Sequence, residues 1–117
     1  MKAILKNYRQ SPRKVRLVTD LVKGKKVDQA LNTLSFTVKR AVPAVKKLIE
    51  SAIANAVHGG LNRDTLKIKN ITVDAGFILK RMMPRARGTG ARINKRTSHI
   101  VVTLSIEEPK NKITKNK

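Results

Sequence analysis

Basic side chains between Lys80 and Arg96 are the first residues whose type and spacing indicate a chemistry. Five arginines and two lysines occur there without any acidic residue. Arginine presents a planar fork of N–H donors that fits phosphate oxygens, and its guanidinium can stack on a nucleobase. A basic run is usually a solvated face, but seven cations without an acid in 17 residues argue against that interpretation here. The segment therefore predicts a nucleic-acid-binding arm, whose candidate contacts are Lys80, Arg81, Arg85, Arg87, Arg92, Lys95 and Arg96.

A second group of basic residues lies near the N-terminus. Residues 1–26 hold nine of them against a single acid, Asp20. Several stand close to the start of a predicted helix, where the helix dipole disfavours cations, so an external anion is expected to stabilise them. The candidate contacts in this part of the chain are Arg9, Arg13, Lys14, Arg16, Lys25 and Lys26. Ser98 and His99, which follow the arm, are two further candidates.

Other kinds of site find little support in the sequence. A nucleotide-binding loop at Gly88-Thr89-Gly90 would need a third glycine and a strand-to-helix context, and neither is present. His58 and His99 have no cysteine partner and no second histidine at ligand spacing. They are expected to be structural or, at most, to hydrogen-bond to RNA. The acidic residues are scattered, whereas a metal-dependent nuclease needs converging carboxylates. We therefore predict no enzymatic activity, no metal and no cofactor.

The overall charge narrows the class of partner. Twenty-seven Lys and Arg face seven Asp and Glu, which gives a formal charge of +20 in 117 residues. Such a body repels itself, and a nucleic acid would relieve the repulsion while releasing its own condensed counterions. A membrane surface is the competing partner, but the chain has no Trp and only 3% aromatic residues. No apolar stretch approaches the roughly 18–20 residues that span a bilayer. The basic N-terminus also lacks a signal-peptide core, so we expect a soluble protein.

Three helices are predicted from apolar residues at helical spacing. Ser11 can cap the first helix, Pro12 fits its first position, and Gly24 can end it. A short second helix is indicated by Val27, Ala30, Leu31 and Leu34. The third and longest carries Ala41, Val45, Leu48, Ile49, Ala52, Ile53, Ala56 and Val57, and the glycine pair 59–60 closes it. Pro43 either sits in the first turn of that helix or kinks it.

Three strands are predicted from alternating apolar residues, at 1–8, 66–75 and 98–106. The parity of the middle strand changes, because Leu66 and Ile68 are followed by Ile71 and Val73. A change of face within one strand is what a bulge produces, so we expect a bulge near residues 69–70.

The arm itself is predicted to be one long hairpin that continues the two later strands. Gly88-Thr89-Gly90 would form its tip, where positive φ is needed. About eight residues per leg at about 3.3 Å each give a reach of roughly 25 Å. A two-stranded hairpin is marginal in water, so we expect the tip to be mobile until a partner orders it. We predict one domain at 1–108, with the arm at 80–97, and a basic, disordered tail at 109–117.

Several stretches closely resemble one known family. They are Lys46–Ala56, Met83–Gly88 and Lys95–Ile100, supported by residues 11–18 and 24–27. Together they resemble the bacterial form of the family of large ribosomal subunit protein twenty-two. The resemblance covers about residues 3–106, which is nearly the whole predicted fold.

The resemblance implies an α+β fold with three helices packed on a small three-stranded antiparallel sheet, and one long protruding β-hairpin. It also implies that the body sits near the exit of the peptide tunnel, that the arm threads through 23S-type rRNA to the tunnel wall, and that the protein acts early in assembly. The expected partners are large-subunit rRNA, neighbouring large-subunit proteins and the nascent peptide, with no membrane and no homo-oligomer. The ribosome would be cytoplasmic and bacterial, or organellar. The tunnel-lining tip would comprise Arg85, Ala86, Arg87, Gly88, Thr89, Gly90 and Arg92.

An architectural DNA-binding protein with basic β-arms is the alternative hypothesis. Proteins of that class insert apolar wedges into the minor groove, and many dimerise to present two arms. Pro84 could act as a wedge, but no obvious dimer face remains once the predicted core is assigned. Competition between duplex DNA and large-subunit rRNA would distinguish the two hypotheses.

Overall fold

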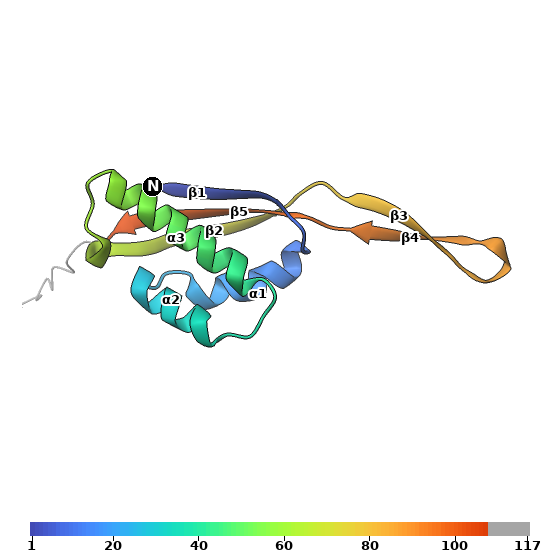
Figure 1. Ribbon diagram of the computed structural model, residues 1–117, viewed down its shortest axis with the longest axis horizontal. Helices are drawn as coiled ribbons and strands as arrows, with labels where there is room; N and C mark the ends of the chain where they lie inside the picture. The colour runs from blue at the N-terminus through green and yellow to red at the C-terminus, as the bar shows by residue number, and fades with distance from the viewer. Residues whose placement is uncertain (108–117) are drawn as a thin grey trace, which may run out of the picture.

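The computed structural model describes residues 1–107 and shows a compact body from which a hairpin projects (Figure 1). The strands are β1 Lys2–Tyr8, β2 Leu66–Ala75, β3 Leu79–Pro84, β4 Gly90–Lys95 and β5 Ser98–Ile106. The helices are α1 Pro12–Val22, α2 Val27–Phe36 and α3 Val42–His58, with short 3-10 turns at Arg63–Thr65 and Ala86–Gly88. The predicted α+β class is thus confirmed. The predicted tail at 109–117 lies outside the described residues.

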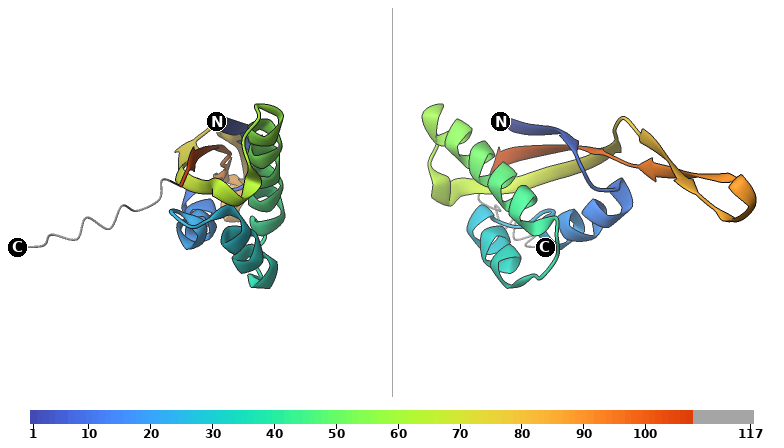
Figure 2. Two further views of the ribbon diagram at one scale, coloured as in Figure 1. Left: turned by 90° about the vertical axis from the view of Figure 1, so that its left-hand side faces the viewer. Right: turned by 45° about the vertical axis from the view of Figure 1, so that its right-hand side comes forward.

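The body is built on a three-stranded antiparallel sheet with the order β1-β5-β2, so the last strand is central. The helices gather against one face of this twisted sheet (Figure 2). That face carries the alternate apolar residues of the strands, including Ala3, Ile100 and Val73, all buried. The predicted alternation fails at two strand ends, because Ala75 and Ile106 are exposed. No helix within residues 1–107 is long and apolar enough to cross a bilayer.

Local backbone requirements fix the ends of α1, much as the sequence predicts. Pro12 occupies the first turn and Gly24, just past the end of the helix, has φ +80°. That left-handed conformation is cheap only for glycine. Ser11 stands at the N-cap position, but its hydroxyl makes no capping hydrogen bond. The predicted cap is therefore wrong in its chemistry, although the boundary is right.

The third helix settles the alternatives for Pro43. The helix begins at Val42 with Pro43 in its first turn, where a missing N–H breaks no helical bond. At the other end Gly60 has φ +89°. Its N–H donates to the Val57 carbonyl at 3.0 Å, and the Leu61 N–H donates to the Ala56 carbonyl at 3.1 Å. This pair of bonds is the Schellman motif, which satisfies carbonyls that the helix leaves free.

The predicted bulge in β2 is present. Ile68 pairs with Leu104, but Asn70 pairs with Thr103, so Lys69 is an extra residue on this strand. The insertion lets Ile68 and Ile71 both face the core, since it reverses the alternation between them. A second irregularity, which the sequence analysis missed, lies between Leu5 and Tyr8 in β1.

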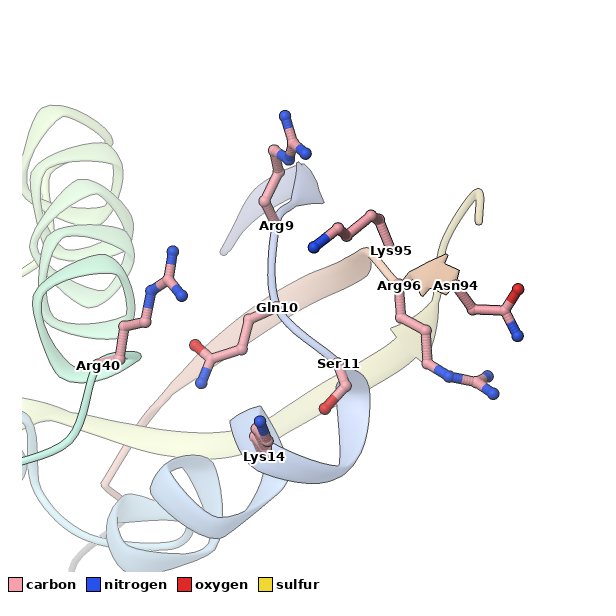
Figure 3. Close-up of a pocket in the computed structure, with 8 residues that line it drawn as sticks. All are labelled: Arg9, Gln10, Ser11, Lys14, Arg40, Asn94, Lys95 and Arg96. Carbon is pink, nitrogen blue, oxygen red and sulfur yellow. The ribbon is translucent and has the colours of Figure 1, made fainter. Parts of the chain in front are cut away.

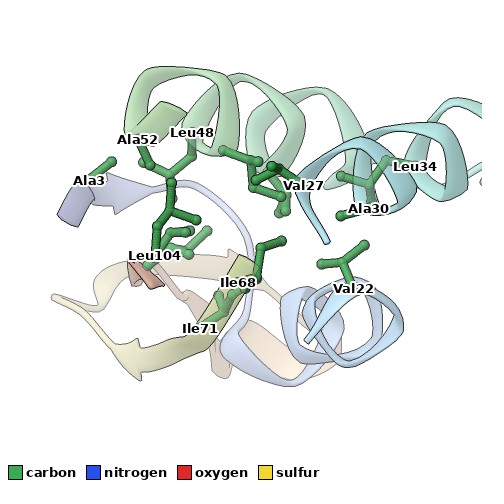
Figure 4. Close-up of a cluster of buried hydrophobic side chains, with 14 of the residues drawn as sticks. Ala3, Val22, Val27, Ala30, Leu34, Leu48, Ala52, Ile68, Ile71 and Leu104 are labelled. Atoms are coloured by element: carbon green, nitrogen blue, oxygen red, sulfur yellow. The ribbon is translucent and has the colours of Figure 1, made fainter. Parts of the chain in front are cut away.

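The core consists of Val, Ile, Leu and Ala side chains from all three helices and the sheet (Figure 4). None of its fully buried members is aromatic. Both phenylalanines lie on the surface instead: Phe36 is 87% exposed and Phe77 is 70% exposed. The core is therefore aliphatic.

Candidate nucleic-acid interface

The arm is a separate two-stranded sheet formed by β3 and β4. Its register runs from the pair Leu79 and Lys95 to the pair Pro84 and Gly90. Residues 80–90 are all exposed, and the described chain measures 76 × 38 × 24 Å along its principal axes. The long dimension follows the arm, which extends away from the helices (Figure 1).

The junction between body and arm is not the unbroken pair of strands that the sequence predicts. Ala75 pairs with Ser98 and Leu79 pairs with Lys95, so three residues on one strand face two on the other. This mismatch interrupts the ladder and separates the two sheets. Hydrogen bonds still bridge the gap. The Gly76 N–H donates to the Thr97 carbonyl at 2.8 Å, and the Thr97 hydroxyl donates to the Phe77 carbonyl at 2.6 Å.

Two side chains at the junction are buried. Thr97 is only 5% exposed, and Ser98 is fully buried with its hydroxyl donating to the Gln10 carbonyl at 2.6 Å. A Cβ on Gly76 would lie 2.5 Å from the Thr97 hydroxyl oxygen. Only glycine fits this position without moving a buried neighbour. The base of the arm is therefore tied both to the sheet and to the segment that precedes α1.

The tip of the arm lies earlier in the chain than predicted. Gly90 belongs to β4 and pairs with Pro84, while the loop is closed by the Arg85 N–H donating to the Thr89 carbonyl at 2.8 Å. Positive φ occurs at Arg87 (63°) and Gly88 (70°) rather than along the whole Gly88-Thr89-Gly90 run. A non-glycine residue with positive φ is uncommon, so sequence patterns favour the wrong position.

Both faces of the arm carry cations. Side chains alternate across a strand, and paired residues share a face. Lys80 and Arg92 therefore lie on one face together with Met82. Arg81 and Lys95 lie on the other. A two-sided cationic ribbon suits insertion between polyanionic segments better than it suits docking on one surface.

A pocket of about 680 Å³ lies where the body meets the base of the arm (Figure 3). Five cations line it: Arg9, Lys14, Arg40, Lys95 and Arg96. Gln10, Ser11 and Asn94 complete the lining, and none of these described residues is acidic. The structure thus brings together predicted residues from the N-terminal group and from the arm.

Arg40 is the member of this cluster that the sequence analysis missed. It lies in the loop before α3, and the Tyr8 hydroxyl donates to its carbonyl at 3.4 Å. No local pattern marks this loop as a neighbour of residues 9–14. Only the way α3 packs beside β1 brings it there, so no signal in the sequence alone could have found it.

The chain matches the family Ribosomal protein L22p/L17e over residues 3–105, which includes both the body and the whole arm. It belongs to this family. It is accordingly a structural constituent of the large ribosomal subunit and not an enzyme. Ribosomal RNA and the ribosome are its partners as a member of the family. The match excludes the architectural DNA-binding hypothesis as the main function, and it confirms the resemblance noted from the sequence.

Some predicted RNA-contact residues of this ribosomal protein also form hydrogen bonds or ion pairs within the body. One Arg16 guanidinium nitrogen donates to the Val73 carbonyl at 2.8 Å and so ties α1 to β2. The Lys26 ammonium lies 3.1 Å from the Glu107 carboxylate, at the end of the sheet away from the arm. Lys25 lies beside it, and its carbonyl accepts from the Ile68 N–H at 3.0 Å. Arg13 is exposed on α1 but does not line the pocket.

The two predicted contact residues that follow the arm, Ser98 and His99, both form hydrogen bonds within the body. Ser98 has no exposed surface and its hydroxyl is committed, so it supports the interface from beneath. His99 accepts a 3.2 Å hydrogen bond at Nδ1 from the Asn7 N–H, which holds the irregular turn of β1. Both side chains therefore make contacts within the body, and a hydrogen bond from the half-buried His99 to RNA stays a prediction.

Within residues 1–107, no acidic side chain forms an ion pair with a cation of the arm or of the pocket. Among residues 1–107 only two ion pairs form, Lys26 with Glu107 and Arg63 with Asp28. Neither involves a cation of the arm or of the pocket. Within the same residues no group of three His, Asp or Glu side chains converges as a metal site would require.

Proposed function

We propose that this protein binds 23S-type rRNA through its arm and through the cationic pocket at the base of the arm. The observation that carries the proposal is the arm itself, which exposes seven cations without an acid. Each phosphate that these cations neutralise releases counterions from the RNA, which favours binding. Membership of the ribosomal family makes rRNA the polyanion in question.

The tip of the arm is proposed to reach the wall of the nascent-peptide tunnel. The arm stands clear of the helices and is long and narrow, so it can enter RNA where a globular surface could not. A free two-stranded ribbon is marginal in water. RNA on both of its faces would supply the support that the body does not. The tip residues proposed to face the tunnel are Arg85, Ala86, Arg87, Gly88, Thr89, Gly90 and Arg92.

We also propose a role in early assembly, which the same geometry supports. The pocket and the tip lie at opposite ends of the arm, so one protein can hold two separate RNA segments at a fixed distance. Contacts with neighbouring large-subunit proteins would fall to the rest of the body. A ribosome of bacterial type remains the proposed setting.

Two measurements test these proposals. Binding of the full-length protein to a large-subunit rRNA transcript should exceed its binding to duplex DNA of equal length at the same salt. Equal or tighter binding to the duplex would contradict the rRNA proposal. In cells, the protein should stay with large subunits through a high-salt wash.

The tunnel proposal needs a position-specific probe. A photo-crosslinking amino acid placed at Thr89 should label a stalled nascent chain. The same probe at Thr33, on the surface of α2, should not. Labelling from both positions, or from neither, would contradict placement of the tip in the tunnel.

A further inference from the structure

The Gln10 side chain lines the cationic pocket and lacks a hydrogen bond that its buried oxygen would be expected to accept. Its side-chain oxygen Oε1 is buried and has no hydrogen-bond partner among the described residues. It is the only buried side-chain atom of residues 1–107 in this condition. Leaving a buried acceptor unpaired costs about 1–3 kcal/mol, so such an atom in a native protein calls for an explanation.

The backbone holds Gln10 in place. Its N–H donates to the Tyr8 carbonyl at 2.9 Å, and its carbonyl accepts from the buried Ser98 hydroxyl at 2.6 Å. With both backbone groups fixed, the side chain cannot leave the pocket by a shift of the loop. Figure 3 shows the Gln10 side chain directed toward Arg40, between the N-terminal segment and α1.

The surrounding cations indicate that a ligand of this pocket carries negative charge. Arg9, Lys14 and Arg40 come from the body, whereas Lys95 and Arg96 come from the base of the arm. They repel one another across the pocket, and an anion would relieve that repulsion. The Ser11 hydroxyl, which does not cap α1, is an additional free donor at the same place.

Gln10 indicates that the ligand also carries a hydrogen-bond donor. A phosphodiester accepts hydrogen bonds but has none to donate, so phosphate alone would leave Oε1 unpaired. A ribonucleotide carries an anionic phosphate and also N–H or O–H donors on its base and its 2′-hydroxyl. The pocket volume of about 680 Å³ is within the range of sites that hold small organic molecules.

We propose that this pocket is a subsite for a single RNA nucleotide. Its phosphate lies among the five cations. The Gln10 side chain turns so that Oε1, which is closed to solvent in the free protein, accepts a hydrogen bond from a base or ribose donor. The proposal rests on the proposed rRNA binding for the source of the nucleotide, but it assigns a specific contact where that function requires only charge. Since the cations come from both body and arm, an occupied pocket would also brace the arm at its base.

Nucleotide titration of the full-length protein tests the subsite, with amide chemical shifts as the readout. The ligands are the four ribonucleoside 5′-monophosphates, their 2′-deoxy forms, and methyl phosphate, which has the same phosphate charge without donors. All should shift the amides of residues 9–14 and 94–96. At least one ribonucleotide should bind roughly five- to tenfold more tightly than methyl phosphate, as one relieved hydrogen bond predicts. Loss of that gain in the deoxy form assigns the donor to the 2′-hydroxyl, and its retention assigns the donor to the base or to the 3′-hydroxyl.

Gln10→Leu is the decisive variant. It should bind methyl phosphate as the wild type does and lose the preference for the nucleotide. Gln29→Leu, an exposed glutamine on α2, is the matched control and should keep the preference. Its spectrum and that of Gln10→Leu should otherwise match the wild type, which shows that both are folded.

Two results would overturn the subsite. One is equal affinity of the wild type for methyl phosphate and for all four nucleotides, a result that does not depend on any variant. The other is a nucleotide preference that survives in Gln10→Leu. Because these probes are mononucleotides, they test the subsite even if the protein does not bind intact rRNA. The subsite and the proposed rRNA binding can therefore be refuted independently.

Discussion

Replacing Arg85, Arg87 and Arg92 together by glutamine should flatten the salt dependence of rRNA binding. All three side chains are exposed at or next to the tip, and none has an acidic partner among residues 1–107. Each lost phosphate contact lowers the slope of log affinity against log salt by about 0.9 on the scale of duplex DNA and about 0.7 on that of single strands. Three contacts therefore change the slope by about 2.1–2.7.

The size of the effect can be stated as an affinity. Between about 50 and 200 mM salt, a slope difference of about 2.7 means that the wild type loses roughly fortyfold more affinity than the variant. Filter binding to a large-subunit rRNA transcript at five or more KCl concentrations would resolve such a change. The fold should be unaffected, because residues 85–92 make no contribution to the buried core.

A matched control separates position from net charge. Lys23, Lys39 and Lys47 are exposed cations outside the arm and the pocket. Converting them to glutamine removes the same charge, and the slope should change less than in the tip variant. An unchanged slope in the tip variant, or an equal change in both variants, would refute the idea that the arm makes specific phosphate contacts.

Three further outcomes are expected from the structure. In free protein, amides of residues 84–92 should exchange rapidly and those of 45–57 slowly; protection at the tip without RNA would mean that the arm is already ordered. Gly76→Ala should destabilise the fold by about 1–3 kcal/mol in urea unfolding, because its Cβ would meet the buried threonine hydroxyl of the junction. Gly59→Ala meets only ordinary contacts and is the control. Ser98→Ala should cost about 1–3 kcal/mol, since it leaves the part-buried Gln10 carbonyl unpaired; a neutral change would show that water replaces the hydroxyl.

Features governed by neighbouring residues could be predicted from the sequence. Pro12 and Gly24 mark the ends of α1 because each imposes its own φ requirement. The bulge at Lys69 could be predicted because it reverses a visible apolar alternation. The cations of the arm were evident because they stand together in the chain without an acid.

Features set by distant segments could not be predicted in this way. The break between the two sheets depends on the offset between the register of β2 with β5 and that of β3 with β4. The sequence of a single strand does not show this offset. Arg40 joins the pocket only because α3 packs beside β1. The role of Gln10 depends on burial and on the absence of a partner, and a lone glutamine in the sequence carries no sign of either.

The hydrogen bonds at the base of the arm link its direction to the pocket. Ser98 directly follows Thr97, whose hydroxyl holds the other leg at Phe77, and the Ser98 hydroxyl holds Gln10 in the pocket floor. A short series of part-buried hydrogen bonds thus runs from the arm to the site where we propose that RNA is held. A rigid base keeps the tip within a small volume near its target, which raises the effective concentration of the second contact. A loose base would leave the same charges on the arm but spread them over many directions. We therefore expect the structural residues Thr97 and Ser98 to contribute to RNA binding by fixing where the cations of the arm point.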